Sequence, residues 1–334
     1  MKQQGLPRWR GFNLEAGISL EREYHEQDFQ MIADLGFDFV RLPVRYDRWS
    51  KPDHPFEIQS SALEFLDAGV RYAEKYNLHV CLNLHKAPGF SVQGFAGEPF
   101  KLFQDDEATR CFCFHWEMLA RRYRSQKNMS FNLLNEPRWV AHQRHDTVMR
   151  AAIEHIRKID ETRLLILDGV NTGNDFPLPL AELAADHVAF STRGYVPLGL
   201  THYEATWGHH QQYEKQPPQW PNGRNRISST GCYDGLWDCR RLETKYRVWA
   251  SLAQAAGAGV VCGECGCYCR TPHDIALAWM EDLLDILTQY NIGYALWNFR
   301  GPFGILDSQR NDVAYEDYRG HLLDRKMLEL LKRY

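Results

Sequence analysis

The sequence lacks the features that mark membrane-spanning, nucleic-acid-binding and secreted proteins. No apolar run approaches the roughly 20 residues that a membrane helix needs. Basic residues are not in excess, because 39 Lys and Arg face 43 Asp and Glu, and a net charge of -4 argues against a general nucleic-acid binder. The first residues, MKQQG, lack the apolar stretch of a secretory signal. We therefore expect a cytoplasmic protein, or a secreted one if a signal has been removed, with neither membrane nor nucleic acid as a partner.

The chain also lacks internal boundaries. No Ser/Gly-rich linker or block of like charge divides the 334 residues, so we predict one domain over residues 1–334. No glycine-rich fingerprint follows the first predicted strand, which weighs against a dinucleotide-binding open sheet.

What the sequence does contain is a repeated alternation of short apolar runs and longer helical stretches. The predicted strands are 10–14, 37–42, 78–84, 129–134, 164–167, 188–191, 259–262 and 294–297. The main helical stretches are 28–35, 62–76, 108–123, 147–159, 242–255 and 272–290. Strands that alternate with helices are parallel and joined by right-handed crossovers. Eight such units predict an α/β fold, a (β/α)8 or TIM barrel, for which a typical length is about 250 residues or more.

One long segment, 199–240, interrupts this alternation after the sixth predicted strand. It contains three tryptophans, Trp207, Trp220 and Trp237, and little periodicity. Long loops in compact proteins are usually functional, and a loop that follows a barrel strand lies at the end of the barrel that carries the active site. We expect an enlarged loop, with one or more of these tryptophans at the edge of a cleft.

Polar and aromatic side chains gather at the predicted strand ends. They are Arg41, His85, Asn135, Glu136, Arg193, Tyr195, Glu264 and Trp297. Each has an ordinary structural explanation when taken alone, but in a barrel the strand ends converge on one pocket. Glycosidic bond hydrolysis needs a carboxylic acid to protonate the leaving oxygen and a carboxylate to attack the anomeric carbon. Glu136 and Glu264 could supply both groups, without a metal or another cofactor.

Several of these residues stand in motifs that resemble glycoside hydrolase family 5, the cellulase-type family. The matching segments are RGFN at 10–13, VRLP at 40–43, NLH at 83–85, LNEP at 134–137, GE at 263–264 and LW at 296–297. The resemblance covers nearly the whole chain. It implies a retaining double-displacement mechanism in which Glu136 is the acid/base and Glu264 the nucleophile.

The resemblance also implies roles for five neighbours. Arg41 and Tyr195 hold the nucleophile, and Asn135 binds the sugar 2-hydroxyl. His85 binds the sugar at the cleaved bond, and Trp297 is the floor on which that ring stacks. The implied substrate is a β-linked glucan or related oligosaccharide, as in an endo-β-1,4-glucanase. Activity as a β-mannosidase, mannanase or β-glucosidase is the alternative within the family.

Arg193 departs from the family pattern, which usually has histidine two residues before the tyrosine. Three interpretations stay open at this stage. Arg193 could pair with an acidic side chain such as Glu264, or bind an anionic sugar through its planar donor fork. It could also point outward between helices.

The sequence also bears on two other possible functions. A non-catalytic carbohydrate-binding barrel is disfavoured because both glutamates are present. A metal-assisted barrel enzyme is disfavoured because Asp and His are scarce at the strand ends.

Four cysteines, Cys262, Cys265, Cys267 and Cys269, surround Glu264 in the sequence. Alternate residues of one strand point to opposite faces, which favours free thiols over a disulfide or a metal site.

Overall fold

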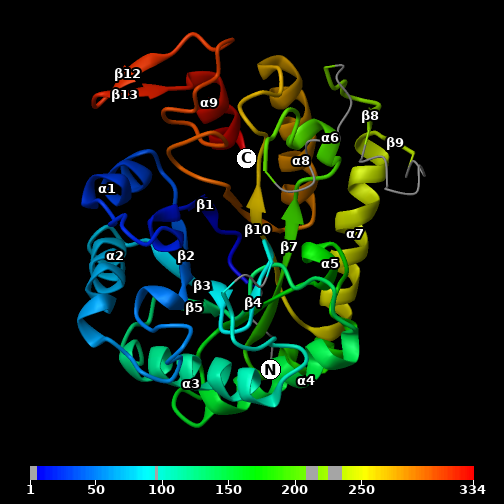
Figure 1. Cartoon of the computed structure of the whole chain (residues 1–334). Coiled ribbons are helices and arrows are strands. Elements are labelled where there is room, and N and C mark those ends of the chain that lie inside the picture. Colours follow the sequence, from blue (N-terminus) through cyan, green and yellow to red (C-terminus); the bar gives the residue numbers. More distant parts are fainter. Residues whose placement is uncertain (1–5, 95–96, 208–216, 225–234) are drawn as a thin grey trace.

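Parallel strands and surrounding helices build the molecule (Figure 1). The computed structural model describes residues 6–94, 97–207, 217–224 and 235–334. Within these residues eight parallel strands close into a barrel, because β2 pairs with β3 as well as with β1. The barrel strands are β1 (Arg10–Asn13), β2 (Phe39–Arg45), β3 (His79–Ala87), β5 (Met129–Asn132), β6 (Leu165–Asp168), β7 (Val188–Gly194), β10 (Val260–Cys265) and β11 (Gly293–Leu296). The predicted barrel is therefore confirmed.

The predicted helices form the outer layer, with bounds that shift by a few residues. They are α1 (Glu26–Asp34), α2 (Glu64–Lys75), α3 (Asp106–Arg122), α4 (His142–Arg157), α7 (Cys239–Ala256) and α8 (His273–Gln289). The sequence explains the ends of α7. The Asp238 side chain accepts a hydrogen bond from the backbone N–H of Arg241 at 2.9 Å, and Gly257 ends the helix with φ +77°. None of the described helices is long and apolar enough to cross a membrane.

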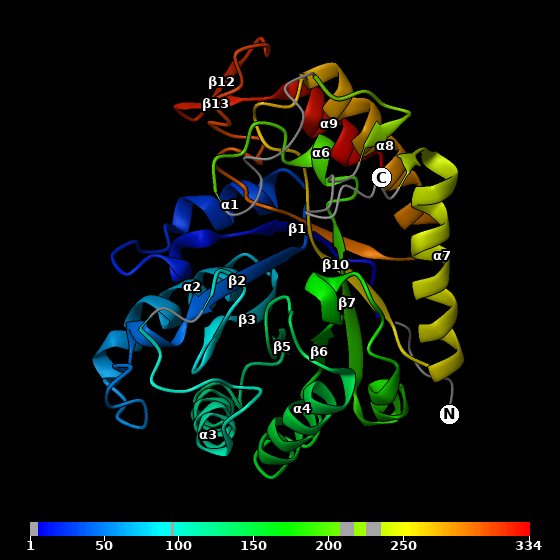
Figure 2. The ribbon, with the colours of Figure 1, turned by 45° about the vertical axis from the view of Figure 1, so that its right-hand side comes forward.

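Other connections were not anticipated from the sequence. Between β6 and β7 the chain forms only the short helix α5 (Val170–Gly173) and the 3-10 segment Leu178–Asp186. After β11 it forms the hairpin β12 (Glu316–Tyr318) and β13 (His321–Leu323), followed by α9 (Arg325–Arg333). Both ribbon views place this hairpin at the same end of the molecule as α6 (Leu198–Thr201), the end toward which β7 and β10 point (Figures 1 and 2).

Two strands are longer than predicted, which changes the position of two candidate residues. Arg41 and His85 were expected at strand ends, but each lies inside its strand. The reason is pairing between neighbours: residues 43–45 of β2 align with residues 83–86 of β3 and extend both strands. The long side chain of Arg41 nevertheless reaches the carboxylate of Glu264.

The two ends of the barrel differ in chemistry. Near the strand starts, an apolar cluster that includes Trp9 and Phe39 fills the interior, and the Trp9 ring stacks on His79 with centroids 3.8 Å apart. Toward the strand ends, the arginines Arg41 and Arg193 are buried with at most 1% of their surface exposed. Buried charges require partners, so the polar end must supply acceptors for both guanidinium groups.

The long segment after β7 is only partly described. It begins with α6 and includes the antiparallel pair β8 (Gly223–Arg224) and β9 (Leu236–Trp237). Residues 208–216 and 225–234, which belong to the predicted loop, lie outside the described residues.

Candidate active site

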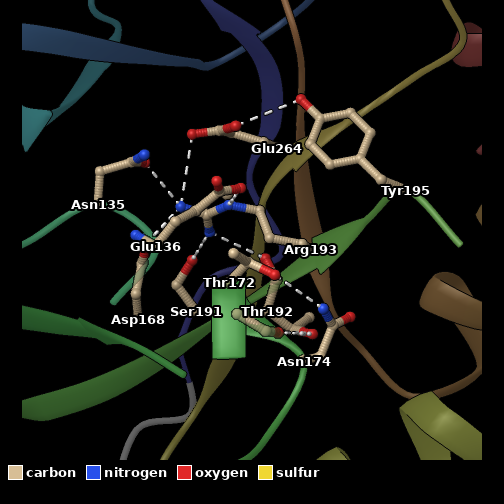
Figure 3. Close-up of polar contacts among 12 residues, drawn as sticks. Asn135, Glu136, Asp168, Thr172, Asn174, Ser191, Thr192, Arg193, Tyr195 and Glu264 are labelled. Carbon is tan, nitrogen blue, oxygen red and sulfur yellow. Dashed lines mark hydrogen bonds and ion pairs between the residues drawn. The ribbon is translucent and has the colours of Figure 1, made fainter. Parts of the chain in front are cut away.

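Glu136 and Glu264 share one guanidinium group at the mouth of the barrel (Figure 3). Glu136 follows β5 and Glu264 lies in β10. The Nε of Arg193 donates to Glu136 Oε1 at 3.0 Å, and its Nη2 lies 3.4 Å from Glu264 Oε1. The two glutamates, which are 128 positions apart in the sequence, therefore face a common site.

Glu264 is held at both carboxylate oxygens. Arg41 donates to Oε1 at 2.7 Å, and the hydroxyl of Tyr195 donates to Oε2 at 3.3 Å. Burial, together with the neighbouring carboxylates, raises the pKa of Tyr195 well above its ordinary value, so its hydroxyl keeps the proton that it donates. The side chain of Glu264 is only 5% exposed. A buried carboxylate with two arginines and one hydroxyl around it is oriented and charge-compensated.

Glu136 has a different environment. Burial, and then the charge of Glu264, raise the pKa of the Glu136 carboxyl group to about 7, and Arg193 opposes this rise. Its backbone adopts φ +47°, a left-handed conformation that is uncommon for residues other than glycine. A carboxyl group with a pKa near neutrality can both release and accept a proton at physiological pH.

Arg193 follows the first of the three interpretations, because it pairs with acidic side chains. The side chain is 2% exposed, so it neither points outward nor faces open solvent. Besides the two glutamates, its fork donates to Ser191 Oγ at 3.0 Å, to the Thr192 carbonyl at 3.2 Å and to Asn135 Oδ1 at 2.9 Å. With its donors engaged inside the protein, the fork is not available to a uronate.

Asp168 is a functional candidate that the sequence reasoning missed. It ends β6, is 2% exposed, and accepts one hydrogen bond from Arg193 Nη2 and another from the backbone N–H of Glu136 at 2.9 Å. The sequence does contain the signal, since Asp168 is a polar residue directly after the apolar run 164–167, at the end of the fifth predicted strand. Asn13 and Asn132 were missed as well, and both accept hydrogen bonds from Arg41.

His85, Trp297 and Asn135 present the surfaces that a sugar could contact. The rings of His85 and Trp297 stack with centroids 5.5 Å apart. Burial, with the charges of Arg41 and Arg193, lowers the pKa of His85 well below its usual value, which keeps the ring neutral. Among the described residues, His85 Nδ1 and Asn135 Nδ2 are buried without a hydrogen-bond partner. Buried polar atoms without partners are costly unless a ligand or water satisfies them.

The loop tryptophans differ in position. Trp207 is 42% exposed, and its ring lies 6.2 Å from His202, whose ring lies 5.1 Å from that of Tyr195. Trp220 instead donates to Asp282 of α8 at 2.8 Å, and Trp237 is buried. Ring contacts thus link Trp207 to Tyr195 through His202, whereas Trp220 is bonded to α8 and Trp237 belongs to the hydrophobic core.

The cysteines around Glu264 are buried free thiols. Cys262, Cys265, Cys267 and Cys269 all belong to this class. Cys262 Sγ contacts the Glu264 carbonyl at 3.4 Å, while Cys265 Sγ contacts the Ala295 carbonyl at 3.6 Å. Over the described part of the chain, no group of three or more His, Cys, Asp or Glu side chains is arranged to hold a metal ion.

Comparison with known protein families shows which family the chain belongs to. The family model for cellulase, glycosyl hydrolase family 5, matches residues 1–301. The chain belongs to glycosyl hydrolase family 5. It is therefore a glycoside hydrolase, as its two facing glutamates suggested.

Relatives of this family 5 protein cover most of its length. Endoglucanase C of Acetivibrio thermocellus is 28% identical over 305 residues, which is 87% of this chain and 88% of the relative. Cellodextrinase A of Ruminococcus flavefaciens is 28% identical over 87% of this chain and 85% of its own length. A solved structure described as a glycoside hydrolase is 34% identical, with a TM-score of 0.88 over 98% of this chain and 99% of that one.

Proposed function

We propose that this family 5 hydrolase cleaves β-1,4-linked glucan chains or their oligosaccharides with retention of anomeric configuration. Glu136 is the acid/base and Glu264 the nucleophile. The observation that supports this most strongly is the contrast between the two carboxyl groups: Glu264 is compensated by Arg41, whereas burial raises the pKa of Glu136 to about 7. The substrate class follows the names of the similar endoglucanase and cellodextrinase.

In the first step a carboxylate oxygen of Glu264 forms a bond to the anomeric carbon. The bond from that carbon to the glycosidic oxygen breaks, and Glu136 transfers its proton to the departing oxygen. Arg41 and Tyr195 keep Glu264 oriented for the attack, because each donates to a different oxygen of the carboxylate.

In the second step water replaces the enzyme at the anomeric carbon. Glu136, now ionised, accepts a proton from the water while the bond from Glu264 to the sugar breaks. Two inversions at the same carbon give overall retention. The separation of the two carboxyl groups is predicted to be about 5–5.5 Å, the spacing for direct attack.

Three further residues of the site are proposed to contact the sugar, and Arg193 is not one of them. Asn135 offers an unpaired Nδ2 donor for the 2-hydroxyl, and His85 offers an unpaired ring nitrogen. Trp297 provides an aromatic face on which the ring stacks. Arg193 is kept from the substrate by burial and acts on the two glutamates instead.

The test is hydrolysis of soluble β-glucans, β-mannans, cellodextrins and nitrophenyl β-glycosides, with NMR of the first product. We expect activity on β-1,4-glucan or cellodextrins, unaffected by chelator, with the β-anomer appearing first. An α-anomer as first product would contradict retention. Faster cleavage of β-mannan than of β-glucan would indicate a mannanase. Binding of these polysaccharides without hydrolysis would indicate a carbohydrate-binding barrel.

A further inference from the structure

Asp168 connects Glu136, which follows β5, with Arg193, which lies in β7. Its Oδ2 accepts the backbone N–H of Glu136 at 2.9 Å and also the guanidinium of Arg193. Its Oδ1 accepts from Asn132 Nδ2 at 2.9 Å, which orients the carboxylate. One buried carboxylate therefore contacts the backbone of Glu136 and the arginine that binds the side chain of Glu136.

The backbone of Glu136 needs such a contact. A non-glycine residue in the left-handed region is strained and persists only where its surroundings enforce that conformation. Glu136 has φ +47°, and Asp168 accepts its N–H within the protein interior. This bond fixes the peptide plane from which the Glu136 carboxyl group projects.

The loop after β6 packs closely against Arg193. Asn171, Thr172 and Gly173 all have positive φ. A Cβ atom on Gly173 would lie 2.6 Å from Cγ of Arg193, so any other residue would displace the arginine. The Thr172 N–H also donates to the carbonyl of Pro137, the neighbour of Glu136, at 3.1 Å. The loop thus makes room for the guanidinium and is bonded to the segment that carries Glu136.

We propose that Asp168 and Arg193 form one positioning pair for Glu136. Asp168 holds its backbone, Arg193 holds its carboxyl group, and the ion pair between them ties the two contacts together. The proposal rests on the assigned role of Glu136 as acid/base.

The pair also acts on the proton of Glu136 in two opposite directions. Burial raises the pKa of Glu136, and the charge of Glu264 raises it further. Arg193 lowers this pKa and Asp168 raises it. Tyr195, whose pKa is raised by burial and by the charges of Glu264 and Glu136, stays protonated beside the pair. Neutralising Asp168 should therefore lower the pKa of Glu136, and removing Arg193 should raise it.

The experiment compares Asp168→Asn and Arg193→Gln with the parent in pH profiles of kcat/KM. The alkaline limb reports loss of the proton from the acid. We expect it to move down by about one pH unit or more in Asp168→Asn and up by a similar amount in Arg193→Gln. Arg193→Lys, which keeps the charge but loses the fork, should lower kcat and leave the limb near its parental position. A purely structural pair would reduce activity in all variants without opposite shifts.

A second measurement is independent of catalysis. Carbon-13 NMR of carboxyl-labelled glutamate, with Glu136 assigned from Glu136→Gln, reads its titration directly in each variant. Asp160→Asn is the matched control, because Asp160 pairs with the buried Arg163 at 2.8 Å in a bridge without contact to Glu136. This control should lose stability without moving the Glu136 titration.

The outcomes separate the two claims. Opposite shifts in Asp168→Asn and Arg193→Gln support the pair, and if Arg193→Gln does not fold, a downward shift in Asp168→Asn supports it alone. A Glu136 titration that stays in place in folded Asp168→Asn overturns it. A parent enzyme without hydrolytic activity would overturn the proposed function, while the NMR titration would still decide whether the pair controls Glu136.

Discussion

The two glutamates proposed as catalytic have opposite kinds of environment in the same site. Glu264 lies within a strand, and both of its oxygens have partners, with Arg41 at 2.7 Å and Tyr195 at 3.3 Å. Glu136 lies beyond the end of its strand in a left-handed conformation, and burial raises its pKa to about 7. Identical side chains thus acquire different chemistry from their neighbours, as acid and nucleophile require.

Arg193 belongs to both environments. It compensates Glu264 and at the same time limits how far the pKa of Glu136 rises. Burial opposes the charge of Arg193 itself, yet the surrounding carboxylates raise its pKa well above the ordinary value. The different environments of the two glutamates therefore depend in part on one arginine, whose charge the surrounding carboxylates stabilise.

Replacing Glu264 with alanine should have the largest effect. Without a nucleophile no covalent intermediate forms, and kcat should fall on the order of 10⁴-fold or more. Added azide should enter the vacated space and give a glycosyl azide of inverted configuration from an activated substrate. If the variant retained normal hydrolysis, Glu264 would not be the nucleophile, and its contrast with Glu136 would have no catalytic meaning.

Glu136→Ala should depend on the leaving group, in contrast to Glu264→Ala. Departure of a poorly acidic sugar hydroxyl needs protonation, so hydrolysis of cellodextrins should fall about 10²–10⁴-fold. The bond-breaking step of a dinitrophenyl glycoside needs none and should be slowed far less. Single-turnover rates on both substrates measure the difference, and equal losses on both would contradict the assignment of Glu136 as acid.

The pH dependence of stability should report the environment of Glu136 without any substrate. The folded pKa of Glu136, about 7, exceeds its unfolded value near 4.5, so folding is penalised when this group is ionised. The penalty is absent below the unfolded pKa, develops as pH rises, and is complete above about 7. Glu136→Gln should therefore have a higher Tm than the parent at pH 8, and this advantage should shrink toward pH 5. An increase in Tm that is the same at every pH would mean that folding does not raise the pKa of Glu136.

Trp207→Ala should have the smallest effect on catalysis. Its ring is exposed and contacts Tyr195 through His202, so if a sugar stacks on it, the loss should cost about 1 kcal/mol, or roughly five-fold in KM for longer oligosaccharides. The matched control is Trp237→Ala, which should lower the free energy of unfolding by about 3–5 kcal/mol with KM unchanged. An unchanged KM in Trp207→Ala would show that Trp207 is structural too.

Much of the architecture could be predicted because it depends on local pattern. Apolar runs alternating with helical stretches predicted the eight barrel strands, and strand ends in such a barrel must converge. The same rule selected Glu136 and Glu264. Applied to the fifth strand as well, it would have selected Asp168, which directly follows that apolar run.

Other features were decided only by the tertiary structure. The Arg193 side chain forms ion pairs with Asp168, Glu136 and Glu264, which come from three other parts of the chain. Spacing in the sequence does not predict which acceptors such a long side chain contacts. The left-handed backbone of Glu136 likewise depends on an acceptor from another strand. Local pattern determines which elements form, whereas the pairing of buried charges is set by packing between elements, because each charge must find its partner wherever the closed barrel brings one within reach.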